Sequence, residues 1–287
     1  MSTQHQATRG LADFDLYPYN PSAPIAWTFL VLFAIAGVVH LLFMIPLRAW
    51  SFIPLILGCA GEAGGYYGRA WSHNNIRLGS AYLIQLMLIL ASAPLIAATI
   101  YMTLGRIIRA LDAEEHAVFS PRWTTKIYVV IDIGSFVCQM AGSAMQASGD
   151  AEGVKLGNNI VMGGLGFQLA AFAIFIVMAA VFHRRLNTEP TAHSRRPNVK
   201  WRRHLWNLYA VSVLVFVRSL FRLIEFAEGP ESKLYKTEVY LYIFDAALMF
   251  LVVALMAIIH PGLLVRSVRK AEVMLSPDDN STFLLRR

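Results

Sequence analysis

Charged side chains, accompanied by a tyrosine, recur inside three strongly apolar stretches of this chain. Within each stretch they are three, four or seven residues apart, so that each set lies on one face of a helix. The sets are Glu62, Tyr66 and Arg69; Arg218, Arg222 and Glu225; and Glu238 and Asp245. An ionisable side chain at the centre of a bilayer costs about 2.5–3.5 kcal/mol, and it therefore usually faces the interior of a helix bundle and has a partner there.

The acids and arginines of these sets nearly balance, which permits two interpretations. Glu62, Glu225, Glu238 and Asp245 stand against three arginines. In the first interpretation, these side chains form a buried ion network that locks three helices together. In the second, they form a polar site or gate in the outer half of the membrane that engages the headgroup of an amphiphile. We expect Arg222 and Asp245 to be electrostatically coupled, with Glu62 and Glu225 as competing partners.

A second polar stripe lies in the stretch 125–147. Asp132, Ser135 and Gln139 are three and four residues apart and share one helix face. Polar side chains of two other stretches could converge on the same face, namely Gln85, Ser92 and Gln168. Because interhelical hydrogen bonds of this kind average below about 1–2 kcal/mol, the stripe either holds helices together or lines a polar path.

Metal and nucleophile chemistry have little support in the sequence. His40 and His260 are the histidines within the apolar stretches, and no helix carries a histidine pair at metal-ligand spacing. No Ser-His-Asp set can be assembled at one depth, and no nucleotide-binding loop is present. We therefore expect no metal, no cofactor and no enzymatic activity.

The elements that must position these residues are transmembrane helices. A spanning helix needs about 20 mostly apolar residues, because it rises about 1.5 Å per residue across a core of about 30 Å. Such stretches are predicted at 25–46, 50–68, 81–103, 125–147, 159–182, 205–227 and 239–260. Most Lys and Arg residues fall in the connections that follow odd-numbered stretches, so the positive-inside rule predicts an outside N-terminus and a cytosolic C-terminus. The sequence thus predicts an all-α membrane protein with seven transmembrane helices.

Composition supports this class. The mean hydropathy is +0.51, with 56% hydrophobic and 15% charged residues, which is unsuited to a soluble globular domain. The net charge of +7 arises mainly from the predicted cytosolic side, and we expect no nucleic-acid partner. The basic connection 183–204 is expected to contact anionic lipid of the inner leaflet. We divide the chain into an extracellular arm (1–24), a transmembrane domain (25–262) and a cytosolic tail (263–287). A short interfacial helix is expected over 262–275, where the transmembrane domain gives way to the tail.

Several longer motifs resemble a known family, and they contain nearly all the polar residues named above. The segments are EAGGYYGR (62–69), YMTLGRII (101–108), PRWTT (121–125), DIGSFVCQMAG (132–142), GNNIVMGGLGFQ (157–168), RSLFRLIEFAEG (218–229), EVYLYIFDA (238–246) and HPG (260–262). From about Tyr19 to Gly262 the chain resembles the fungal RTA-like family, also called the lipid-translocating exporter family.

The resemblance implies a function in lipid transport. It suggests a translocator or exporter of amphiphilic lipids, such as sphingoid long-chain bases or sterol-like compounds, that gives resistance to toxic amphiphiles and stress. It places the protein in a fungal membrane, for which we expect the plasma membrane, with membrane lipids or lipid-like amphiphiles as partners. Two alternatives remain open, a seven-helix receptor-like lipid or stress sensor and a membrane-embedded lipid-modifying enzyme.

Overall fold

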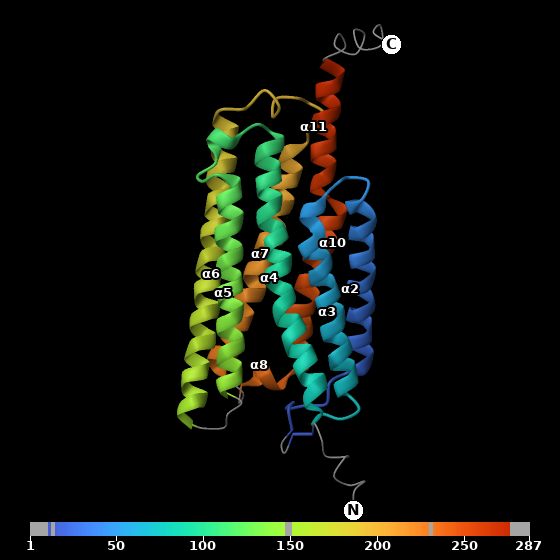
Figure 1. Ribbon diagram of the computed structural model, residues 1–287, viewed down its shortest axis with the longest axis vertical. Coiled ribbons are helices and arrows are strands. Elements are labelled where there is room, and N and C mark those ends of the chain that lie inside the picture. The colour runs from blue at the N-terminus through green and yellow to red at the C-terminus, as the bar shows by residue number, and fades with distance from the viewer. Residues whose placement is uncertain (1–10, 13–14, 147–150, 230–231, 276–287) are drawn as a thin grey trace, which may run out of the picture.

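The structure of the protein is a computed structural model, which describes residues 11–12, 15–146, 151–229 and 232–275. The described residues are helical apart from turns, connections and one isolated bridge between Leu11 and Leu78. The long helices lie side by side in a single bundle, with the described N-terminal segment and α11 at opposite ends of it (Figure 1). We call the end at which the N-terminal segment packs the arm end, and the other end the tail end.

The helices follow one another with short connections. The first half of the chain contains α2 (Ala23–Met44), η1 (Trp50–Phe52), α3 (Ile53–Ser72), α4 (Gly79–Ala110), η2 (Glu114–His116) and α5 (Pro121–Gln146). The second half contains α6 (Ala151–Thr188), α7 (Trp201–Glu228), α8 (Lys233–Lys236), α9 (Glu238–Leu241), η3 (Tyr242–Ala247), α10 (Leu248–Ile258) and α11 (Pro261–Leu275). Proline stands in the first turn of α2, α3, α5 and α11, where its missing N–H leaves no hydrogen bond unmade.

Five helical stretches among the described residues are long and apolar enough to cross a membrane. They are α2, α4, α5, Glu152–Thr188 of α6, and Glu238–Arg269, which runs through α9, η3, α10 and most of α11. The sequence predicts seven, and the two remaining stretches correspond to α3 and α7. Both run along the bundle with the others (Figure 1), but the charged residues singled out above lower their mean hydropathy.

Close packing between neighbouring helices depends on glycine, as Gly68 and Gly142 show. A Cβ atom on Gly68 of α3 would lie 2.9 Å from the Ala81 carbonyl oxygen of α4. A Cβ atom on Gly142 of α5 would lie 2.5 Å from the carbonyl oxygen of Gly157 in α6. Because the obstacle in each case is backbone rather than a flexible side chain, a larger residue would force the helices apart.

The helical stretch predicted at 239–260 is interrupted near its start. Tyr242–Ala247 forms the π-helical segment η3, between the α-helical turns of α9 and α10. A π segment inserts an extra residue into the helix and changes the direction in which the following side chains point. Asp245 lies inside this segment, so its spacing from Glu238 does not follow the regular α-helical period assumed from the sequence. Such segments are frequent at functional sites.

Candidate functional site

Five ionisable side chains, four of them buried and Arg222 partly buried, meet in the arm-end half of the bundle. We call them the charge cluster: Glu62, Arg218, Arg222, Glu225 and Asp245. Arg222 Nη2 donates to Asp245 Oδ2 at 2.5 Å and Arg222 Nη1 donates to Glu225 Oε2 at 3.0 Å. Arg218 Nε lies 2.5 Å from Asp245 Oδ1, close enough for an ion pair, although its angle is poor for a hydrogen bond. Asp245 is therefore the shared counter-ion of both arginines.

The local structure explains why Asp245 can reach two arginines. Arg218 and Arg222 are one helical turn apart and face the same side of α7. The π segment η3 packs against this part of α7. Asp245 is 1% exposed and Arg218 is 5% exposed, so these pairs are shielded from water and their attraction is strong.

Glu62 enters the charge cluster from α3 without an ion pair of its own. Its Oε1 atom accepts a hydrogen bond of 2.6 Å from the Ser92 hydroxyl of α4. Within the described residues, no arginine, lysine or histidine forms a salt bridge with Glu62, although its charge interacts with those of Asp245 and Arg218. Glu62 is 1% exposed, so its carboxyl group cannot be hydrated by bulk water.

Tyr66, one turn after Glu62, adds an unused polar group. Its ring is fully buried and stacks on Phe33 of α2 at a centroid distance of 5.9 Å. Its hydroxyl has no hydrogen-bond partner among the described residues, and neither does Nη2 of Arg218. Buried polar atoms are usually hydrogen-bonded, and those that are not call for an explanation.

Arg69 belongs to a second, separate group at the arm end. Its Nη2 atom contacts Glu238 Oε1 at 2.8 Å and the Tyr19 hydroxyl at 2.9 Å, and its Nε donates to the Tyr242 hydroxyl at 3.0 Å. The rings of Tyr17, Tyr19 and Tyr242 surround the guanidinium at 5.9, 5.5 and 5.2 Å. We call this group the arginine cage.

The N-terminal segment packs over the arm end of the bundle, next to the arginine cage. The Ser22 backbone N–H donates to Glu238 Oε1 at 2.8 Å, and the Tyr17 hydroxyl donates to Gln85 Oε1 at 2.7 Å. Tyr17 also contacts the Ser72 hydroxyl at 2.9 Å. Burial raises the pKa of Tyr17, so it stays a neutral hydrogen-bond donor. The segment that the sequence predicts to be an extracellular arm is thus packed onto α3 and α4 where the structure describes it.

A third group, the amide cluster, joins α5 to α6. Gln139 Nε2 donates to Gln168 Oε1 at 3.2 Å, and Gln168 Nε2 donates to Asp132 Oδ1 at 3.2 Å. Ser135 is buried beside them, and its hydroxyl has no partner among the described residues. Of the residues expected to converge on this stripe, Gln168 does so, whereas Gln85 and Ser92 do not. They bind Tyr17 and Glu62 instead, because they lie on the face of α4 that packs against α3.

The sequence analysis therefore identified these polar residues, but it did not predict which of them belong to the charge cluster and which to the arginine cage. Glu62 and Arg69 share a face of α3, yet they belong to the charge cluster and to the arginine cage respectively. Glu238 and Asp245 are divided in the same way. The cage tyrosines Tyr17, Tyr19 and Tyr242 were missed. Their aromatic character near a helix end was the available signal, but such residues are common at membrane interfaces.

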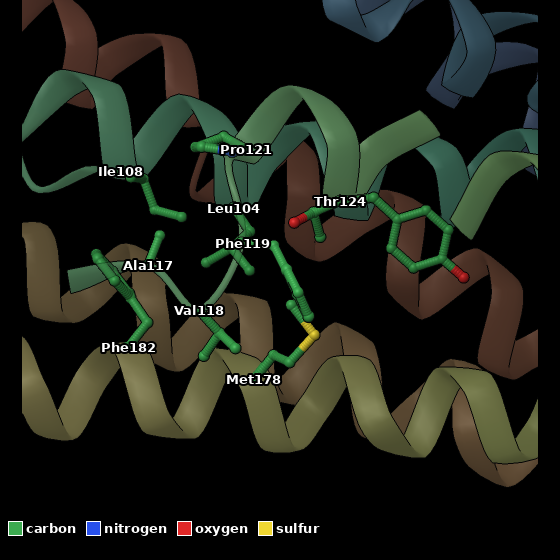
Figure 2. A pocket seen from close by; sticks show the side chains of 11 residues that line it. Leu104, Ile108, Ala117, Val118, Phe119, Pro121, Thr124, Met178 and Phe182 are labelled. Atoms are coloured by element: carbon green, nitrogen blue, oxygen red, sulfur yellow. The ribbon is translucent and has the colours of Figure 1, made fainter. Parts of the chain in front are cut away.

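An apolar cavity lies towards the tail end, between α4, α5 and α6. Figure 2 shows its lining, which includes Leu104, Ile108, Phe119, Met178 and Phe182. Its volume is about 10 Å³, which is room for about one water molecule. It is too small to hold an amphiphile. Among the described residues, no group of three His, Cys, Asp or Glu side chains could hold a metal ion.

Several apolar helices, together with ionisable groups gathered inside the bundle, define an integral multi-pass membrane protein. Residues 55–267 match the family described as RTA1 like protein. The chain is also 33% identical over 273 residues to the protein RTA1 of Saccharomyces cerevisiae, covering 86% of this chain and 85% of that protein. The chain belongs to the RTA1-like family, which confirms the resemblance seen in its motifs.

Two further relatives have names that state a substrate. The chain is 34% identical to protoporphyrin uptake protein 1 of Saccharomyces cerevisiae, over 71% of this chain and 66% of that protein. It is 26% identical to a sphingoid long-chain base transporter of the same species, over 87% of this chain and 74% of that protein. These names describe transport or uptake rather than catalysis. No solved structure matches the chain.

Proposed function

We propose that this protein moves amphiphilic lipids across a fungal membrane, and that the charge cluster engages the polar headgroup while the apolar tail stays in the bilayer. The observation that carries the proposal is the position of the cluster. It gathers charged groups from α3, α7 and η3 inside an otherwise apolar bundle, and it leaves a tyrosine hydroxyl and an arginine N–H without partners. Hydrogen-bonding capacity left unused in a buried site is available to a ligand.

We further propose that α3 and α7 also cross the membrane, which makes seven spans. Away from the helix ends, their charged side chains, such as Glu62 and Arg218, face the interior of the bundle, whereas the exposed side chains there are largely apolar. On α3 these include Leu57 (54% exposed), and on α7 they include Val213 (53% exposed). A helix with an apolar outer surface and a charged inner face is suited to lipid on one side and protein on the other.

We propose that the protein lies in the plasma membrane. In the proposed orientation, the arm end faces the outside of the cell and the tail end faces the cytosol. This orientation rests on the distribution of Lys and Arg residues. The connection 183–204 lies at the tail end and is partly ordered there, because the Thr191 hydroxyl donates to the Leu111 carbonyl oxygen at 2.7 Å. Its basic residues are then positioned to contact anionic lipid of the inner leaflet.

The substrate class follows from the chemistry of the charge cluster and from the relatives. A sphingoid base has an amine and hydroxyl groups next to a long apolar chain, so its headgroup can bind both carboxylates and neutral hydroxyls. Such a molecule fits a cluster in which acids outnumber arginines. Sterol-like compounds, which have a smaller polar group, remain a second substrate class.

A reconstitution experiment tests the proposal. Purified protein in vesicles should move labelled sphingosine between leaflets faster than protein-free vesicles do. Binding of sphingosine without any movement would contradict translocation and favour a receptor-like sensor. Conversion of sphingosine to a product would contradict it in favour of a lipid-modifying enzyme.

A further inference from the structure

The charge cluster lacks one positive charge. Asp245 forms ion pairs with Arg218 and Arg222, and Glu225 forms an ion pair with Arg222. The two negative charges of these acids therefore balance the two positive charges of the arginines. Glu62 is then a third carboxyl group against two guanidinium groups. A buried carboxylate with no counter-ion is strongly disfavoured, so such a group takes up a proton or a cation.

The surroundings of Glu62 contain nothing in the described residues that supplies this charge. The titratable and charged groups near it are Cys59 and Tyr66 on α3, Arg218 and Arg222 on α7, and Asp245 in η3. From α4 it meets the neutral Ser92 hydroxyl. The part of α2 that packs here contributes aromatic rings, such as Phe33 against Tyr66. Both arginines are already engaged with Asp245, so Glu62 remains the excess acid.

Two side-chain hydroxyl groups suited to an ammonium group accompany Glu62 in this part of the bundle, one from α4 and one from α3. A primary ammonium has three N–H donors. Glu62 and Ser92 are joined at 2.6 Å, and Tyr66, one turn along α3, presents a fully buried hydroxyl without a partner among the described residues. The Tyr66 hydroxyl is an independent indication of a missing ligand, because an unsatisfied polar group at complete burial is unfavourable.

We propose that Glu62 is an exchange site that holds either a proton or the protonated primary amine of a lipid headgroup. In the empty site the carboxyl group is neutral. When the ammonium enters, the O–H bond of Glu62 breaks, one proton leaves to solvent, and the carboxylate pairs with the ammonium while Ser92 and Tyr66 bind it. One positive charge enters and one leaves, so the net charge of the cluster is conserved. This inference rests on the proposed function, and it couples the binding of an amine lipid to the release of one proton.

The test counts protons on ligand binding, using the full-length protein in lipid nanodiscs and a pH-indicator dye in weakly buffered solution. The probes are sphingosine and N-acetylsphingosine, which has the same chain and hydroxyl groups but no charged amine. We expect sphingosine to release about one proton per molecule bound and N-acetylsphingosine to release none. Empty nanodiscs give the baseline, and absence of proton release from the wild-type protein overturns the inference.

Two variants connect the proton to Glu62. Glu62→Gln should release no proton and should bind sphingosine about tenfold more weakly or worse, because a charge-assisted contact is lost. Asp132→Asn removes a buried carboxyl group of the amide cluster and should keep the wild-type proton count. Unchanged proton release in Glu62→Gln, or its loss in Asp132→Asn, overturns the assignment.

The outcomes also separate this inference from the proposed function. Binding of N-acetylsphingosine and a monodisperse elution profile show that a variant is folded. Proton release without movement of sphingosine across vesicles contradicts translocation and leaves the exchange site standing. Movement of sphingosine without proton release contradicts the exchange site and leaves translocation standing.

Discussion

Arg222 and Asp245 link α7 to the π segment η3, with Nη2 and Oδ2 2.5 Å apart. Asp245 is 1% exposed, so removal of either partner leaves the other in a low-dielectric environment. Breaking a buried pair by removing one partner typically costs about 3–5 kcal/mol. Asp245 also contacts Arg218 at 2.5 Å. Removal of Asp245 therefore affects two arginines, whereas removal of Arg222 leaves Asp245 with Arg218.

This difference gives the first prediction. Asp245→Ala should lower the free energy of unfolding more than Arg222→Ala does, because it leaves two arginines with Glu225 as the remaining ion-pair partner. In the double variant, the free energy of unfolding should fall by less than the sum of the decreases in the two single variants. Unfolding in mixed micelles, with membrane abundance as a second readout, measures the cycle. Strictly additive losses would show that the two residues are not coupled.

The arginine cage should hold the N-terminal segment in place. Arg69→Ala removes the guanidinium that contacts Tyr19, Tyr242 and Glu238, and hydrogen bonds to charged groups contribute about 1.5–3 kcal/mol each. We expect hydrogen exchange of residues 15–22 to accelerate at least about tenfold, in line with a loss of at least 1.4 kcal/mol. Arg77→Ala serves as the control, because the pair it forms with Asp15 is half exposed and contributes little. Equal acceleration in the two variants would argue against the cage.

The amide cluster is expected to act in packing. Gln139→Leu removes one hydrogen bond to Gln168, and interhelical hydrogen bonds average about 0.6 kcal/mol. The variant should fold, insert and keep its tolerance of a toxic sphingoid base, with a small decrease in thermal stability. A strong loss of tolerance at normal abundance would instead place Gln139 on the transport path.

The proposed orientation makes a further prediction. Asn280 lies outside the described residues, and its sequence matches the glycosylation pattern. It should nevertheless remain unmodified, because glycans are added on the luminal face. An acceptor engineered near Lys155, at the arm end, should be used when it lies far enough from the bilayer. A glycan on native Asn280 would show that the C-terminal segment lies on the luminal side, which contradicts the proposed orientation.

The sequence predicts the helices and their polar faces better than it predicts which helices these faces contact. The helical period correctly places Arg218 with Arg222 on one face, and the cost of charge in lipid agrees with the burial of Arg218 and the partial burial of Arg222. The period fails at Asp245, because no residue pattern in 238–246 marks the π segment. It fails again at Gln85, because the sequence does not show that an N-terminal segment folds back over the arm end. Spacing along one helix fixes a face, but the partner of that face depends on the other helices.

Tyr66 gives the most direct test of the claim that the charge cluster binds the headgroup. Its hydroxyl is buried without a partner among the described residues, so Tyr66→Phe should leave stability unchanged or slightly increased if the hydroxyl has no ligand to bind. Ser135→Ala is the matched control, since it removes another buried, unpartnered hydroxyl, in this case from the amide cluster.

The decisive measurement is the rate at which each variant moves labelled sphingosine across reconstituted vesicles, at equal protein content. A headgroup bound at the charge cluster predicts that Tyr66→Phe slows translocation about five- to tenfold, which corresponds to the loss of a hydrogen bond worth about 1–1.5 kcal/mol. It predicts a wild-type rate for Ser135→Ala and undiminished stability for both variants. Wild-type translocation by Tyr66→Phe would contradict headgroup binding at this site.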